Sequence, residues 1–338
     1  MMKNIVTEAQ QRIATDNTRR HFLQKCMSGL GAVALGSLTG CQLGDEKGTS
    51  VLADTTGFPK PHFPGKAKNI IFLHMAGAPS QLELFDYKPV LNQLDGKDCP
   101  QSLLEGKKFA FIQGTPQMLG TQAKFNQHGQ SGAYVSDYLP HFSQMVDEVT
   151  FLKAVHTDEF NHAPAQLFMH TGSPRLGRPS MGSWITYGLG SDNQNLPSFV
   201  VLVSGSEPSA GKSAWGSGFL PTVYQGVQCR SKGDPVLYLS NPSEVDPYLR
   251  KRSIDAINEI NEREYQEAHD PEILTRISQY ELAYRMQTSV PEVMNINDEP
   301  EWVHQLYGTE PGKASFANNC LLARRLVENG VRFVQLFY

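Results

Sequence analysis

The sequence contains few cysteines, and none of them stands in a pair that would bind zinc. No two are separated by only two residues, so the spacing excludes a zinc finger or a CxxC redox motif. The cysteines are Cys26, Cys41, Cys99, Cys229 and Cys320.

An excess of either charge is also missing. The chain has 30 Lys and Arg against 34 Asp and Glu, which leaves a formal net charge of −4. Proteins that bind nucleic acid through the phosphate backbone are usually basic, so we expect no nucleic-acid partner. At 338 residues, with 40% hydrophobic and 19% charged residues, the chain has an ordinary globular composition and can form one large domain.

Long hydrophobic runs are absent as well. Residues 26–38 form a weakly apolar run that is too short to span a bilayer, which takes about 20 residues. This run follows Arg19-Arg20 and Phe22-Leu23, an arrangement that resembles a twin-arginine export signal. The resemblance implies export of a folded protein by the twin-arginine translocation machinery. The alternative is a basic N-terminus without a targeting role.

The end of this segment resembles a lipobox. Residues 38–41 have the sequence Leu-Thr-Gly-Cys, in which cleavage before Cys41 would expose the thiol to acylation. The alternative is an ordinary cleavage site among small residues. We therefore expect a signal peptide at 1–41, a flexible tether at 42–67 and the folded domain at 68–338. The exported protein would be periplasmic, or a lipoprotein of the outer membrane or cell surface. If Cys41 is acylated, its lipid anchors the protein in the membrane.

Short apolar runs that alternate with amphipathic helices predict an α/β fold. We expect a mostly parallel central sheet with helices on both faces. Residues 69–74 form an unbroken apolar run typical of a central strand that is buried on both faces. Residues 90–135 predict an insertion or hairpin. Further strands are expected at 109–112, 151–155, 196–203, 233–239 and 331–338, and helices at 135–146, 181–189, 246–269, 271–287 and 315–329.

The segment at 151–189 is the predicted site. Its apolar start, 151–155, is followed by a polar turn and by a helix that begins near Pro164. Open α/β sheets bind ligands at the carboxyl ends of their strands. We therefore expect the side chains of this turn to lie at a ligand site.

Three histidines are candidate ligands of a divalent metal ion. His74 ends the first predicted strand, His156 ends the strand at 151–155, and His162 follows in the turn. Neutral imidazole is a common metal ligand, but a histidine at a strand end can equally be structural. His156 can instead support another ligand.

Other polar residues of the segment have two interpretations each. Asn161 either donates to a substrate oxyanion or caps the helix that follows. Arg178 either binds sulfate or phosphate or pairs with a carboxylate of the fold. Ser180 caps a helix or acts as a nucleophile. Trp184 and Tyr187 are expected in the core.

Several separated motifs resemble the exported bacterial family of unknown function DUF1501, which is itself similar to sulfatases of the alkaline phosphatase superfamily. The resemblance covers residues 68–338. The motifs are at 77–89, 161–165, 170–172, 177–184, 187–191 and 328–334.

This resemblance implies a sulfatase-like fold, a divalent metal ion and catalytic roles for His162, Asn161 and Arg178. His162 stands where sulfatases carry the Cys or Ser that becomes formylglycine, which a histidine cannot form. It would then act as a nucleophile, as a metal ligand or only structurally. In the family the strand matching 331–338 continues into further metal ligands, so we expect this chain to be truncated at its C-terminus.

Two functions follow as expectations. The first is a metal-dependent hydrolase of sulfate or phosphate esters, with sulfated or phosphorylated glycans as partners. The second is a catalytically inactive cell-surface protein that uses the same fold for binding or structure.

Replacement of Cys41 by serine tests the lipid anchor. Serine cannot be acylated through a thioether, so we expect Cys41→Ser to move the protein from the detergent phase to the aqueous phase in Triton X-114 partitioning. Cys26→Ser is the matched control and should leave partitioning unchanged. Unchanged recovery of Cys41→Ser in the detergent phase would rule out the anchor.

Overall fold

The computed structural model describes residues 63, 65–107, 109, 111–230, 233–236, 241 and 244–338. They divide into two compact units. The first combines the residues up to His74 with Gln166–Tyr338, and the second is Met75–Ala165. The predicted signal segment with Arg19, Arg20 and Cys41 lies outside the described residues. None of the described helices is long and apolar enough to cross a membrane.

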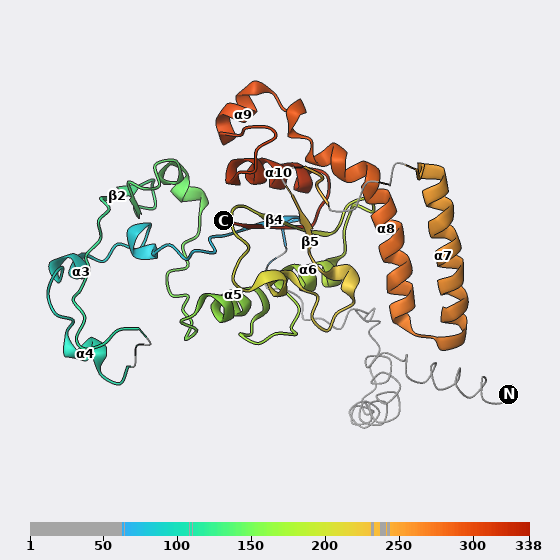
Figure 1. The fold of residues 1–338 in the computed structure, drawn as a ribbon. Helices are drawn as coiled ribbons and strands as arrows, with labels where there is room; N and C mark the ends of the chain where they lie inside the picture. Colours follow the sequence, from blue (N-terminus) through green and yellow to red (C-terminus); the bar gives the residue numbers. More distant parts are fainter. Residues whose placement is uncertain are drawn as a thin grey trace, which may run out of the picture. The chain divides into compact units, whose positions relative to one another are not determined.

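A four-stranded parallel sheet forms the centre of the first unit (Figure 1). Its order is β1 (Ile70–His74), β6 (Phe333–Phe337), β4 (Phe199–Val203) and β5 (Val227–Cys229). Every neighbouring pair is parallel, with His74 level with Phe337 on β6. The prediction of an α/β fold with a parallel sheet is confirmed.

Strand β6 is buried along its whole length because helices cover both faces of the sheet. Val334 and Leu336 point to one face and join the main hydrophobic core with Leu322 and Leu326 of α10 (Phe316–Glu328). Residues 333, 335 and 337 point to the opposite face, because side chains alternate along a strand. That face is covered by α6 (Met181–Leu189) and by the 3-10 helix η3 (Gly211–Trp215).

Two long helices form a hairpin in the first unit (Figure 1). These helices, α7 (Pro247–Ala268) and α8 (Pro271–Met294), both begin with a proline behind an aspartate that caps the first turn. The helices predicted at 246–269 and 271–287 are confirmed, although α8 continues past Pro291. It is followed by η5 (Ile296–Asp298), α9 (Glu301–Tyr307) and the predicted helix α10, which Ser315 caps.

The second unit consists of short elements. Its hairpin joins β2 (Phe125–His128) to β3 (Ala133–Ser136), which confirms a hairpin in this part of the chain. The carboxylate of Asp147 accepts the backbone N–H groups of Gln130 and Ser131 at 2.8 Å and so fixes the turn. The remaining elements are η1 (Gln81–Glu83), α3 (Pro89–Gln93), α4 (Gln101–Leu104) and η2 (Phe142–Glu148).

Helix α5 (His162–Thr171) begins in the second unit and ends in the first. Pro164 lies in its first turn, where the missing N–H costs no helical hydrogen bond. The predicted helix start near this proline is confirmed.

Two predicted elements around the site segment are wrong. Residues 151–155 form no strand. Leu152 and Val155 are exposed, and the ring of Phe151 instead packs on Phe85 and Phe142. The helix predicted at 135–146 is wrong in its first part, because the residues up to Ser136 belong to β3 and Pro140 follows. Only 142–146 are helical, within the 3-10 helix η2.

The edges of the sheet also differ from the prediction. β1 is an edge strand rather than a central one, and Ile71 and Leu73 are exposed on it. An unbroken apolar run does not distinguish these two positions. Residues 233–236 are bends, and the rest of the strand predicted at 233–239 lies outside the described residues. The opposite edge strand is β5, which was not predicted.

The strand predicted at 109–112 is not seen in the described residues of that segment.

Two side chains of α6 also depart from expectation. Trp184 and Tyr187 are about half exposed and do not lie in the core. The buried side of α6 is formed instead by the small residues Gly182, Ser183 and Thr186.

Candidate functional site

The carboxyl ends of three strands meet at one edge of the sheet in the first unit. β1 ends at His74, β6 at Phe337 and β4 at Val203, and these three residues are in register. Parallel sheets of this type place ligands at that edge. The only titratable side chain among the three is His74.

A second histidine lies against His74. The ring centroids of His74 and His170 are 4.6 Å apart with an interplanar angle of 64°. Phe72 and Phe337 flank His170 with centroid distances of 5.4 and 5.3 Å. His170 is only 1% exposed, so the pair lies in a largely apolar environment.

One buried amide positions His170. The side-chain Nε2 of Gln335 donates to Nδ1 of His170 at 3.3 Å and to the backbone oxygen of Ala214 at 3.4 Å. Since Nδ1 accepts a hydrogen bond, the neutral ring carries its proton on Nε2. That Nε2 is buried and has no partner among the described residues, and neither does Oε1 of Gln335. His170 and Gln335, which are hydrogen-bonded to each other, therefore each keep one buried polar atom without a partner in the described part of the chain.

Both histidines are held neutral by their surroundings. Burial, and secondly the nearby ring of His74, lower the pKa of His170 from 6.5 to about 3. Burial also lowers the pKa of His74 below its usual value. Neutral imidazole is the form that binds a metal ion or donates one hydrogen bond to an oxyanion.

The opposite face of the sheet has a smaller polar pair at the same edge. Nδ2 of Asn319 on α10 donates to Oγ of Ser204 at 2.7 Å, and the Ser204 N–H donates to the oxygen of Phe337 at 2.9 Å. Oδ1 of Asn319 is buried without a partner in the described part of the chain. This pair contains no group that titrates near neutral pH.

The predicted residues of the second unit are exposed. His156 lies in an irregular segment, and His162 begins α5. The backbone oxygen of Asn161 accepts from the N–H of Ala165, but no side-chain cap by Asn161 is seen among the described residues. The expected convergence of His162 on His74 rested on the strand at 151–155, which does not exist. The roles of these three residues stay predictions.

Two further predicted residues lie next to each other before α6. Ser180 is fully buried, and its Oγ accepts the N–H of Ser183, which confirms it as a helix cap. Arg178 is exposed, and no carboxylate pairs with it in the described residues. The guanidinium is therefore free to meet an anion.

His170 is the site residue that the sequence analysis missed. It lies three residues after Leu167 and four after Gln166, and these three residues form the buried side of α5. The helical spacing therefore carried a signal that His170 faces inward. Its contact with His74 could not be foreseen, because the sequence does not show which strand α5 covers.

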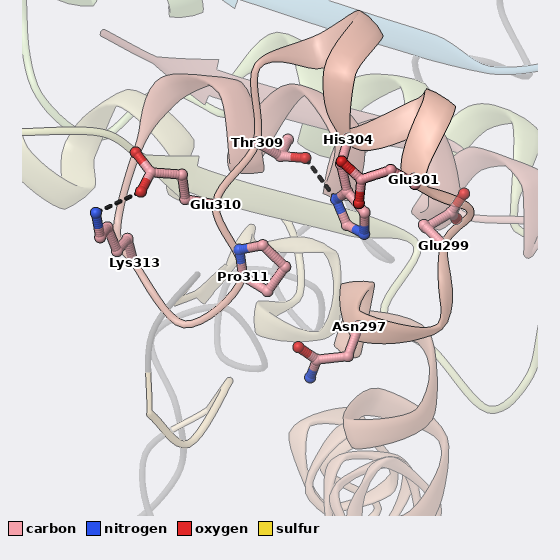
Figure 2. Close-up of a pocket in the computed structure, with 8 residues that line it drawn as sticks. All are labelled: Asn297, Glu299, Glu301, His304, Thr309, Glu310, Pro311 and Lys313. Carbon is pink, nitrogen blue, oxygen red and sulfur yellow. Dashed lines mark hydrogen bonds and ion pairs between the residues drawn. The ribbon is translucent and has the colours of Figure 1, made fainter.

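A separate pocket of about 500 Å³ lies between α9 and the loop before α10 (Figure 2). Most of its charged groups are already paired, and Glu301 accepts a hydrogen bond from the Gln305 amide. Nδ1 of His304 is hydrogen-bonded to Oγ1 of Thr309 at 2.7 Å, Glu310 is paired with Lys313, and Glu299 is bound by two arginines of α10. Within the described residues no group of three or more metal-ligating side chains occurs. The residues that line the pocket are Asn297, Glu299, Glu301, His304, Thr309, Glu310, Pro311 and Lys313.

The low pKa of His170 predicts an acid dependence of stability. In the unfolded chain His170 binds a proton below pH 6.5, whereas in the folded protein it does so only near pH 3. The unfolded state therefore binds more protons in this window, and stability falls as the pH decreases from 6.5 towards 3. The contribution is at most about 1.4 kcal/mol per pH unit.

Urea unfolding across this window measures the effect. We expect His170→Asn to flatten the dependence of the unfolding free energy on pH, while the exposed control His141→Asn keeps the wild-type slope. Equal slopes for the wild type and His170→Asn would show that His170 is not held neutral.

Comparison with known proteins identifies a family but no characterised relative. The model of the family DUF1501, described as a protein of unknown function, matches residues 67–338. No curated protein and no solved structure matches the chain.

Proposed function

The chain belongs to the DUF1501 family of proteins of unknown function. We propose that it is an exported hydrolase that cleaves sulfate or phosphate esters with a divalent metal ion. The observation that carries this proposal is the buried contact between two neutral histidines at the carboxyl edge of the sheet. Unprotonated imidazole is the form that coordinates a metal ion.

The unpaired atoms support the assignment of this pair. A metal ion on Nε2 of His170 requires the proton to be on Nδ1. Rotation of the Gln335 amide would then let its Oε1 accept that proton, at the cost of the 3.4 Å hydrogen bond to Ala214. The ion would satisfy Nε2 of His170 and the rotation would satisfy Oε1 of Gln335, while Nε2 of Gln335 would lose both of its present partners.

The described residues supply part of such a site. Catalytic zinc sites generally use three protein ligands and keep one open position. His74 and His170 of the first unit would be two of them, whereas His156 and His162 of the second unit are proposed as metal ligands independently of this pair. A bound metal ion would polarise the ester oxygen and stabilise the charge that develops on it.

The other proposed roles belong to residues that are exposed to solvent. The guanidinium of Arg178 would bind two oxygens of the sulfate or phosphate group. Asn161 would donate to an oxyanion, and His162 would be the nucleophile or a ligand. Gln335 is a positioning residue, because it touches His170 and not the reacting atoms.

The place of action is part of the same proposal. Arg19 and Arg20 would direct export through the twin-arginine translocation machinery, and acylated Cys41 would hold the protein at a membrane. Sulfated or phosphorylated glycans outside the cytoplasm are the proposed partners.

A second function is favoured by one observation. The part of the chain that the structure describes contains no group of three metal-ligating side chains. A protein that retains the fold but has lost catalysis, and that binds partners at the cell surface, fits this observation.

Metal analysis and an activity panel separate the two functions. The full chain would be loaded with zinc, dialysed, analysed by ICP-MS and assayed with aryl sulfates and aryl phosphates. We expect about one zinc per chain, and its loss in His74→Ala and His170→Asn because each variant removes a nitrogen ligand. His141→Ala, which removes an exposed histidine, is the matched control and should retain the metal.

The outcomes are distinct. Zinc that stays bound in both site variants would contradict the assignment of His74 and His170. A wild-type protein that is metal-free and inactive on every ester would favour the binding protein. Circular dichroism of each variant shows whether a loss of metal reflects a loss of fold.

A further inference from the structure

A row of four aromatic side chains lies along α6 on the side away from the core. The centroid of Phe219 is 5.6 Å from that of Trp184, Trp184 is 6.2 Å from Tyr187, and Tyr187 is 5.2 Å from Tyr224. All three contacts are edge-to-face, a geometry that holds aromatic rings in fixed orientations. The row is therefore one continuous set of contacting rings.

Three rings of this row are open to solvent, whereas Tyr224 is partly buried. Trp184 is 45% exposed, Tyr187 is 51% exposed and Phe219 is 56% exposed. Their position follows from the sequence of α6, since its small residues face the sheet and its aromatic residues are left outside. Large aromatic side chains gathered on a surface usually mark a binding site.

Arg178 lies beside one end of the row. Gly218, which precedes Phe219, has a φ of +55°, and a Cβ there would lie 2.4 Å from the backbone carbon of Arg178. The N–H of Ser180 donates to the oxygen of Gly216 at 3.0 Å, so the two loops run side by side. Glycine at 218 is needed for this approach.

The charge of these segments has one sign. Residues 173–191 and 208–230 together contain no Asp or Glu, although Asp192 follows the first range directly and Glu207 directly precedes the second. Their charged residues are Arg175, Arg178, Lys212 and Arg230. Such a local excess of positive charge favours an anionic ligand.

We propose that the row of aromatic rings and Arg178 bind a sulfated saccharide. A sugar ring presents an apolar face of C–H groups that packs on aromatic rings, and its sulfate group accepts paired hydrogen bonds from a guanidinium. The inference rests on the proposed function and extends it, since the saccharide would be the part of the substrate that carries the ester.

Isothermal titration of the full chain with a short dextran sulfate tests the site. Unsulfated dextran of the same length and sodium sulfate are the reference ligands. We expect dextran sulfate to bind more tightly than either, and Trp184→Ala and Arg178→Ala each to weaken its binding about tenfold. Trp184→Phe keeps a ring and should retain most of the affinity.

The exposed Trp302 of α9 provides the matched control. Trp302→Ala should bind dextran sulfate as the wild type does. Equal weakening by Trp302→Ala, unchanged binding by Trp184→Ala, or sodium sulfate as tight a ligand as dextran sulfate would each overturn the proposal. So would sedimentation velocity showing a dimer that only Trp184→Ala dissociates, because the row would then be an interface between two copies.

The proposed function is tested separately. The histidine pair is required for hydrolysis of small aryl esters, and Trp184 only for binding of the saccharide, whereas Arg178 is proposed to act in both. A failure of one measurement is therefore distinguishable from a failure of the other.

Discussion

The fold of the first unit depends on the complete burial of β6. This strand lies between β1 and β4, and helices cover both of its faces, so each of its side chains needs a partner within the protein. Four of its five residues are apolar and pack in the core. Gln335 is the exception, and an unsatisfied buried amide would cost about 1–3 kcal/mol. Its hydrogen bonds to His170 and Ala214 connect the sheet to α5 and η3.

The same burial keeps the histidine pair at the carboxyl edge of the sheet unprotonated. His170 is covered by aromatic rings and cannot take up a proton near neutral pH, and His74 lies beside it. The pair is fixed by a strand end and a helix, which are rigid supports for a site. On the outer side of the same layer, α6 carries aromatic rings and is preceded by an exposed arginine. The buried histidine pair and the exposed aromatic row thus both lie in the first unit.

Elements whose patterns are local were predictable from the sequence. The buried strands β4 and β6 follow from unbroken apolar runs, and α7, α8 and α10 follow from helical spacing and from caps at Asp246, Asp270 and Ser315. The strand predicted at 151–155 failed because the fate of a short apolar run depends on distant partners. The contact between His74 and His170 could not be predicted for the same reason, since it joins residues 96 positions apart (170 − 74). The exposure of Trp184 also depends on how α6 is rotated against the sheet.

The position of the proton on His170 tests the central claim most directly. Long-range ¹H–¹⁵N correlation spectra of the protein with labelled histidine distinguish a proton on Nδ1 from one on Nε2. The account predicts a proton on Nε2 in the metal-free protein, held there by the Gln335 amide, and a shift of the proton to Nδ1 when zinc is added. A proton that stays on Nε2 in the presence of saturating zinc would contradict the claim that this histidine pair binds a metal ion.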